Sequence, residues 1–135
     1  MKIIGLRVVL RDERRTGDDD DFFRWLNLAE WNYYDESDQP FKPISRAAFE
    51  KLLAEWQRRA RTPDPDSHTW QIDTVEGRHV GWINYYQLDE QAGRAYVGLD
   101  LPEEETWSQG YGTEALSLLI DYLFGEMGLA RAPSP

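Results

Sequence analysis

The sequence predicts an α+β fold with a mostly antiparallel sheet, and three observations support this prediction. Three strand-like runs at 69–75, 80–88 and 94–101 follow one another with short turns between them, which favours an antiparallel meander. Two stretches with apolar residues at helical spacing precede these runs. A strongly apolar helical stretch follows them, and a turn with two glycines opens it.

The elements before the meander are one strand and two helices. Residues 5–12 are predicted as a strand because β-branched valines lie at its centre. Residues 18–28 form the first helical pattern, and the second covers 45–61 with Ser45 as a plausible N-cap. The predicted order is therefore β-α-α-β-β-β-α.

The last predicted helix covers about 113–127 and is apolar around most of its circumference, so we expect burial on more than one side. Gly98 interrupts the strand before it, and a glycine inside a strand suggests a bulge or a close backbone approach. We expect one domain over 1–129 and a disordered tail at 130–135.

Composition and charge exclude several classes of function. The 135 residues carry a formal net charge of −10, which disfavours binding to nucleic acid. The chain has no cysteine, so disulfides, thiol nucleophiles and cysteine-based zinc sites are excluded. No apolar run is long enough to span a membrane and no signal peptide is visible, so we expect a cytoplasmic protein without membrane contact.

Four consecutive carboxylates at Asp18–Asp21 are the strongest local charge feature. We interpret them as a solvated helix N-terminus, where negative charge complements the helix dipole. A calcium or magnesium site is the alternative, but no EF-hand spacing surrounds them, and we expect no bound metal.

The turn before the last helix has the layout that binds phosphate. Glycines allow backbone N–H groups to approach an anion, and the helix N-terminus adds a partial positive charge. Ala115 stands where a dinucleotide-binding fingerprint needs its third glycine, and no Gly-Lys-Ser/Thr follows as in a P-loop. A tight turn that merely starts a helix is the alternative.

This turn resembles the Arg/Gln-x-x-Gly-x-Gly/Ala motif of the GNAT acetyltransferases, which holds the diphosphate of acetyl-CoA. Trp107 stands at the first motif position instead of Arg or Gln. The run Gly-Tyr-Gly-Thr-Glu-Ala-Leu at 110–116 is similar to the ribosomal-protein N-acetyltransferase branch. The resemblance covers nearly the whole chain and implies a three-layer α+β fold, with acetyl-CoA as co-substrate.

The resemblance also implies the residues that bind the co-substrate. In the family, a bulge in the strand before the turn lets the pantetheine arm pair with the backbone, and here Gly98 would mark that bulge. The co-substrate residues implied in this sequence are Leu99, Asp100, Leu101, Trp107, Ser108, Gln109, Gly110, Tyr111, Gly112 and Thr113. Tyr96 occupies the place where many relatives carry a catalytic glutamate, so no catalytic residue is identified.

Relatives place acceptor specificity between the first two helices. That region contains aromatic residues for a substrate body and carboxylates for an ammonium group. The candidate acceptor residues are Trp31, Tyr33, Tyr34, Asp35 and Glu36. Packing of this segment on the core is the alternative.

Relatives continue beyond the last helix with a strand, a helix and further strands, whereas this chain ends with Arg-Ala-Pro-Ser-Pro. We therefore expect a GNAT domain that lacks this C-terminal portion, and self-association, for example a dimer, through the uncovered sheet edge and the last helix. The expected function is transfer of acetyl to a protein N-terminus or a small cationic amine. A catalytically impaired remnant that binds CoA or only self-associates is one alternative, and an interaction domain without CoA binding is another.

Overall fold

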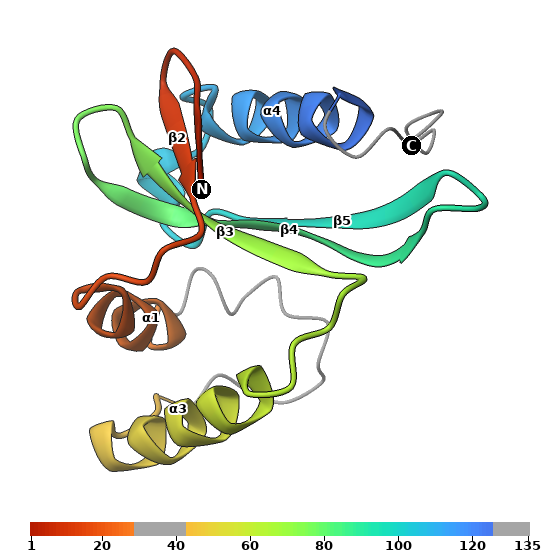
Figure 1. The fold of residues 1–135 in the computed structure, drawn as a ribbon. Coiled ribbons are helices and arrows are strands. Elements are labelled where there is room, and N and C mark those ends of the chain that lie inside the picture. Colours follow the sequence, from red (N-terminus) through yellow and green to blue (C-terminus); the bar gives the residue numbers. More distant parts are fainter. Residues whose placement is uncertain (29–42, 126–135) are drawn as a thin grey trace. The chain divides into compact units, whose positions relative to one another are not determined.

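The computed structural model describes residues 1–28 and 43–125, which form two compact units. The sheet unit comprises Met1–Glu13, Asp64–Leu101 and the chain from Thr106 onward, and the helical unit comprises Arg14–Pro63 and Pro102–Glu105. The described elements are β1 (Lys2–Ile4), β2 (Val8–Arg11), α1 (Asp18–Leu26), α3 (Arg46–Ala60), β3 (His68–Thr74), β4 (His79–Asp89), β5 (Arg94–Asp100), the 3₁₀ helix η1 (Glu104–Thr106) and α4 (Tyr111–Gly125) (Figure 1).

The sheet unit is built on a five-stranded sheet in the order β1-β2-β3-β4-β5, with every neighbouring pair antiparallel. This arrangement confirms the predicted meander of β3, β4 and β5. The predicted first strand is shorter than expected, and β1 pairs with it as a hairpin in which Ile3 lies opposite Leu10. The sequence did not predict β1, because its short apolar run carries no turn signal strong enough to separate it from β2.

The irregularities of the sheet lie on β4, which corrects the expectation for Gly98. Gly98 pairs with Asn84 in an unbroken register, whereas the register between β4 and β5 shifts between Tyr86 and Asp89. Gln87 within that shift has a φ of 51°. A Cβ at Gly98 would lie 2.5 Å from Asn84 Oδ1, so this glycine serves a close approach of the neighbouring strand.

Helix α4 covers one face of the sheet (Figure 1). Ala115, Leu119 and Leu123 are its buried residues, and they join a core formed by side chains from the five strands and α4. Leu116 on the same helix is 37% exposed. Among the described residues the fully buried side chains of α4 form a single stripe, whereas its other sides are half-buried or exposed, so burial is less complete than predicted.

The helical unit has an aromatic core of its own. Trp25 and Phe49 are fully buried, and Phe22 packs edge-on against both Trp25 and Trp56. The Ser45 side chain accepts a hydrogen bond from the Ala48 N–H at 3.1 Å, which confirms the predicted N-cap of the second helix.

The four aspartates of α1 occupy its first turn, as predicted, but they are less solvated than expected. Asp18 is buried and accepts a hydrogen bond from the Arg15 N–H. Arginines pair with the other three carboxylates, namely Arg14 with Asp19, Arg46 with Asp20 and Arg24 with Asp21.

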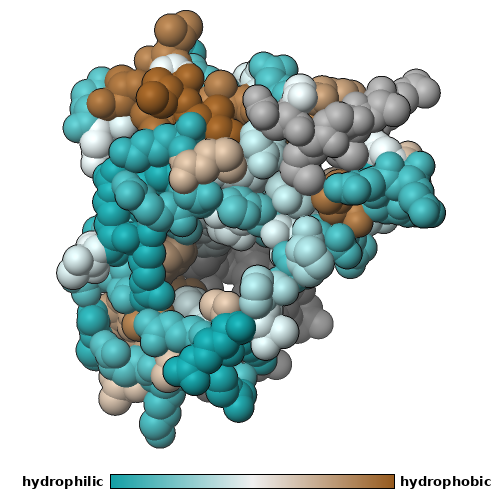
Figure 2. Space-filling view, in the orientation of Figure 1, coloured by the Kyte–Doolittle hydropathy of each residue, from teal (hydrophilic) through white to brown (hydrophobic). Residues whose placement is uncertain are grey.

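Apolar side chains also gather on the surface of the sheet unit, where Figure 2 shows a brown patch over the β1–β2 hairpin. Leu6 in the hairpin loop is 92% exposed and Ile4 is 73% exposed. None of the described helices has the length and apolar character needed to cross a membrane.

Candidate functional site

The glycine turn places a row of backbone amides at the start of α4. Ser108 has a φ of 62° and Gly110 has a φ of 81°, both in the left-handed region. These two reversals let the chain leave η1 and enter the helix at Tyr111, two residues earlier than predicted. The Glu114 N–H donates to the Gly110 carbonyl at 3.1 Å and closes the first helical turn.

The amides of Tyr111, Gly112 and Thr113 precede this first helical hydrogen bond. Across the described part of the chain, no backbone or side-chain acceptor lies within hydrogen-bond distance of these three amides. The first N–H groups of a helix lack partners within that helix, and together with the helix dipole they favour an anion. The turn can therefore bind a phosphate group through its main chain.

Trp107 closes the loop that leads into the turn. Its indole N–H donates to the Leu101 carbonyl at 2.6 Å, so the bond spans the segment between β5 and the turn. A Cβ at Gly112 would lie 3.3 Å from Leu99 Cδ2 and 3.5 Å from Leu101 Cδ1. The structure thus brings Leu99, Leu101, Trp107 and Gly112 together, while Ser108, Gln109 and Thr113 are exposed around them.

Glu114 joins the turn to the opposite end of the chain, and sequence reasoning did not identify this role. Its Oε1 accepts the N–H of Arg7 at 2.8 Å and the N–H of Val8 at 3.0 Å. Burial of the carboxyl group alone would raise the pKa of Glu114, but backbone N–H groups of Arg7, Val8 and Leu6 outweigh this effect and lower it. The carboxylate therefore fixes the start of α4 against the β1–β2 hairpin.

The strand before the turn has an open edge. Within the described residues β5 pairs with β4 alone, and Asp100 lies opposite Trp82 at its last paired position. Tyr96 stacks on Tyr86 with ring centroids 5.6 Å apart and is 55% exposed. Backbone groups along this edge are thus in reach of an extended ligand.

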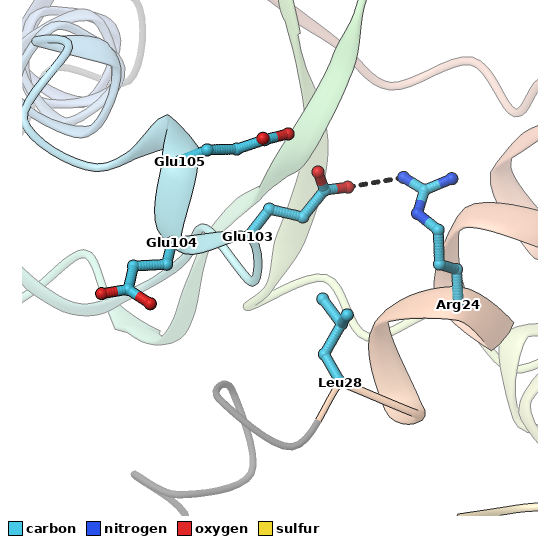
Figure 3. Close-up of a pocket in the computed structure, with 5 residues that line it drawn as sticks. All are labelled: Arg24, Leu28, Glu103, Glu104 and Glu105. Carbon is cyan, nitrogen blue, oxygen red and sulfur yellow. Dashed lines mark hydrogen bonds and ion pairs between the residues drawn. The ribbon is translucent and has the colours of Figure 1, made fainter.

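The helical unit contains an acidic pocket with a volume of about 510 Å³. Arg24, Leu28 and three consecutive glutamates, Glu103 to Glu105, line it, and Figure 3 shows the Glu103 carboxylate pointing toward Arg24 and the Glu104 carboxylate pointing away from it. Glu103 Oε1 accepts from Arg24 Nη2 at 2.6 Å and from the Trp25 indole N–H at 2.8 Å. Burial would raise the pKa of Glu103, but these hydrogen bonds and the nearby Arg24 charge lower it to about 2.

Glu104 and Glu105 are exposed at the rim of this pocket. Negative charge around a cavity of this size suits a small ligand that carries a positive charge. The acceptor residues predicted from the sequence, Trp31, Tyr33, Tyr34, Asp35 and Glu36, lie outside the described residues. The sequence did not point to Glu103–Glu105, because a run of three glutamates also suits an ordinary exposed loop.

Comparison with known proteins identifies the family. The model of the acetyltransferase (GNAT) domain matches residues 7–134 of this sequence. The chain therefore belongs to the GNAT acetyltransferase family, and the five-stranded antiparallel sheet with its helices is the α+β fold that the sequence predicted.

Solved structures of similar fold include three acetyltransferases. Spermidine N-acetyltransferase from Vibrio cholerae, in complex with CoA and spermine, has a TM-score of 0.68 at 15% identity, with 93% of this chain and 68% of that chain covered. A GNAT-family acetyltransferase from Bacillus anthracis has a TM-score of 0.67 at 16% identity, with 98% and 71% covered. Ribosomal L7/L12 alpha-N-protein acetyltransferase in complex with coenzyme A has a TM-score of 0.66 at 16% identity, with 97% and 71% covered.

One curated relative matches in sequence. The uncharacterized N-acetyltransferase p20 of Bacillus licheniformis is 36% identical over 52 residues. The match covers 38% of this chain and 29% of that protein, so the chain spans less than a third of this relative.

Proposed function

We propose that this protein is an acetyl-CoA-dependent N-acetyltransferase that transfers acetyl to an amine. The observation that carries the proposal is the row of amides at Tyr111, Gly112 and Thr113, which have no acceptor among the described residues. Two left-handed residues, Ser108 and Gly110, set this row at the N-terminus of α4. In a chain of the GNAT family, the diphosphate of acetyl-CoA is the anion that fits such a row.

The open edge of β5 supports the placement of the rest of the co-substrate. We assign the pantetheine arm to the backbone of Leu99, Asp100 and Leu101, where it adds to the sheet as an extended strand would. The Trp107 indole N–H donates to the Leu101 carbonyl and so fixes the loop that separates the proposed pantetheine and diphosphate sites. Ser108, Gln109 and Thr113 border the diphosphate as exposed polar residues.

The proposed reaction is direct acyl transfer. The neutral amine nitrogen attacks the thioester carbonyl, and the new C–N bond replaces the C–S bond. The proton that the nitrogen loses balances the departing thiolate, so the products are the amide and the CoA thiol. Backbone N–H groups can stabilise the negative charge that develops on the carbonyl oxygen. Tyr96 stands in place of the family's glutamate, and we assign the proton to no side chain.

The acidic pocket of the helical unit favours a cationic amine as acceptor. Glu103 is neutralised by Arg24, whereas Glu104 and Glu105 add negative charge at the rim of a pocket of about 510 Å³. Similar structures are named for spermidine and for a ribosomal protein, so a polyamine and a peptide with the ribosomal L7/L12 N-terminus are the acceptors to test first.

Calorimetric titration with acetyl-CoA, followed by an assay for CoA thiol release in the presence of each amine, tests this function. We expect saturable one-to-one binding and release of thiol with at least one acceptor. Binding without release from any amine would favour the alternative, a remnant that binds CoA without catalysis. No binding of acetyl-CoA would overturn the proposal.

We also propose self-association through the edge of β5 and the exposed side of α4. Leu99 on β5 is 38% exposed and Leu116 on α4 is 37% exposed, and an open strand edge invites pairing with a second copy. Because the pantetheine arm is assigned to the same edge, we expect acetyl-CoA to shift the protein toward the monomer in sedimentation velocity. A monomer throughout the micromolar range without ligand would contradict self-association and leave the enzymatic proposal intact.

A further inference from the structure

A single arginine from the opposite end of the chain lies against the glycine turn. The guanidinium of Arg7, in the loop between β1 and β2, packs on Gly110 so closely that a Cβ at Gly110 would overlap Arg7 Nη1. We propose that Arg7 is a binding residue for the diphosphate of the co-substrate, next to the amides at the start of α4. This inference rests on the proposed function, because it names a further contact in the same site.

The backbone of Arg7 is held from both sides. Its N–H donates to the Glu114 carboxylate at 2.8 Å, and its carbonyl accepts the Val75 N–H at 3.0 Å. The hairpin loop therefore presents this residue at a fixed place beside the helix N-terminus, although it is more than a hundred positions away in the sequence.

The side chain of Arg7 is available for a ligand. The residue is exposed, and within residues 1–28 and 43–125 its guanidinium makes no hydrogen bond or ion pair. The Glu114 carboxylate accepts the backbone N–H groups of Arg7 and Val8, and the Arg7 charge helps to lower its pKa without forming an ion pair with it. A guanidinium offers several N–H donors in one plane and matches the oxygens of a phosphate.

The identity of Trp107 supports a role for a cation from elsewhere in the chain. Where the family motif has Arg or Gln, this chain has a tryptophan whose N–H is committed to the Leu101 carbonyl. A protein with a formal net charge of −10 repels a phosphorylated ligand, and a local cation beside the amides would offset that field. Arg7 supplies it from a different segment, and the bare Cα of Gly110 leaves the space in which the guanidinium lies.

Calorimetric titration of the full chain with CoA and with 3′-dephospho-CoA tests this assignment, because both ligands carry the diphosphate and only CoA carries the 3′-phosphate. The variants are Arg7→Ala and Arg7→Lys. The matched control is Arg94→Ala, since Arg94 is also exposed, belongs to the same unit and begins β5 at the end opposite Asp100. Circular dichroism melts establish that each variant is folded.

We expect Arg7→Ala to weaken binding of both ligands about tenfold, the size of one charge-assisted hydrogen-bonded contact. Arg7→Lys keeps the charge without the planar fork, so about a threefold loss is expected, and Arg94→Ala should bind like the wild type. If Arg7→Ala does not fold, the Arg7→Lys variant decides the question by the same comparison.

Three results would overturn the role of Arg7 while the proposed function stands. The first is wild-type affinity for both ligands in Arg7→Ala. The second is a loss of affinity for CoA alone, which would move the contact to the 3′-phosphate. The third is an equal loss of affinity in Arg94→Ala, which would indicate a general charge effect. Failure of the wild-type protein to bind either ligand is a different outcome, because it overturns the proposed function and the inference together.

Discussion

Replacement of Glu114 by alanine tests how the start of α4 is held in place. The carboxylate accepts two backbone N–H groups from the β1–β2 hairpin, at 2.8 Å and 3.0 Å, and it lies in the first turn of the helix. Glu114→Ala removes both bonds and leaves the N–H groups of Arg7 and Val8 without this acceptor. The hairpin should then separate more easily from the helix.

The expected loss of stability follows from these contacts. A hydrogen bond to a charged group contributes about 1.5–3 kcal/mol, and because this site is partly open to solvent we take about 1 kcal/mol for each of the two bonds. The favourable charge near a helix N-terminus adds about 0.3–1 kcal/mol. The sum is about 2.3–3 kcal/mol, which corresponds to a fall in melting temperature of roughly 7–15 °C for a chain of this size.

Thermal unfolding followed by circular dichroism measures this effect. Asp121→Ala is the matched control, because it removes an exposed carboxylate from the same helix that makes no hydrogen bond or ion pair with any described residue. This control should stay within about 0.5 kcal/mol of the wild type. A Glu114→Ala protein with the same melting temperature as the control would refute the proposal that Glu114 holds the start of α4 against the β1–β2 hairpin.

Two further predictions concern the turn and the acidic pocket. Gly110→Ala places a Cβ on a residue with a φ of 81° and against the Arg7 guanidinium, so we expect about 1–2 kcal/mol of destabilisation and weaker CoA binding. The control is Gly125→Ala, whose Cβ meets open space, and it should be neutral or stabilising. Equal melting temperatures of the two glycine variants would show that a Cβ at Gly110 causes no strain. The pKa of Glu103 is lowered from 4.5 to about 2, so its contribution to stability is complete above pH 4.5 and is lost as the pH falls toward 2. Chemical unfolding from pH 6 to pH 2 should therefore show that the free energy of unfolding falls less steeply in Glu103→Gln than in the wild type. An equally steep fall in both proteins would count against the role of the Glu103–Arg24 pair.

Much of the fold could be predicted because the signals are local. The N-cap at Ser45 and the two hairpins of the meander each follow from a few neighbouring residues, and the structure has them where the sequence indicated. The glycine turn was likewise visible as two glycines before an apolar helix, and α4 begins there. Short-range steric preferences decide such features, so sequence reasoning reaches them.

The parts that sequence reasoning missed depend on contacts between distant residues. The Glu114 carboxylate binds the N–H groups of Arg7 and Val8, which lie 107 and 106 residues before it in the sequence. A glutamate in the first turn of a helix is too common to predict such a partner. The bulge was assigned to Gly98 by resemblance, yet the register shifts lie on β4, because strand pairing and not residue type fixes where an extra residue is accommodated. Of the arginine partners of α1, Arg46 is distant, 26 residues from Asp20, whereas Arg14 and Arg24 form local pairs with Asp19 and Asp21 that the sequence analysis did not predict.

The most direct test of the account is an NMR titration of ¹⁵N-labelled protein with CoA. We expect saturable chemical-shift changes at the amides of Tyr111, Gly112 and Thr113 and at the Arg7 guanidinium, and unchanged shifts for the amides of the β3–β4 turn around Gly77. Saturable binding with these three amides unmoved, or no binding at all, would contradict the claim that the start of α4 binds the diphosphate.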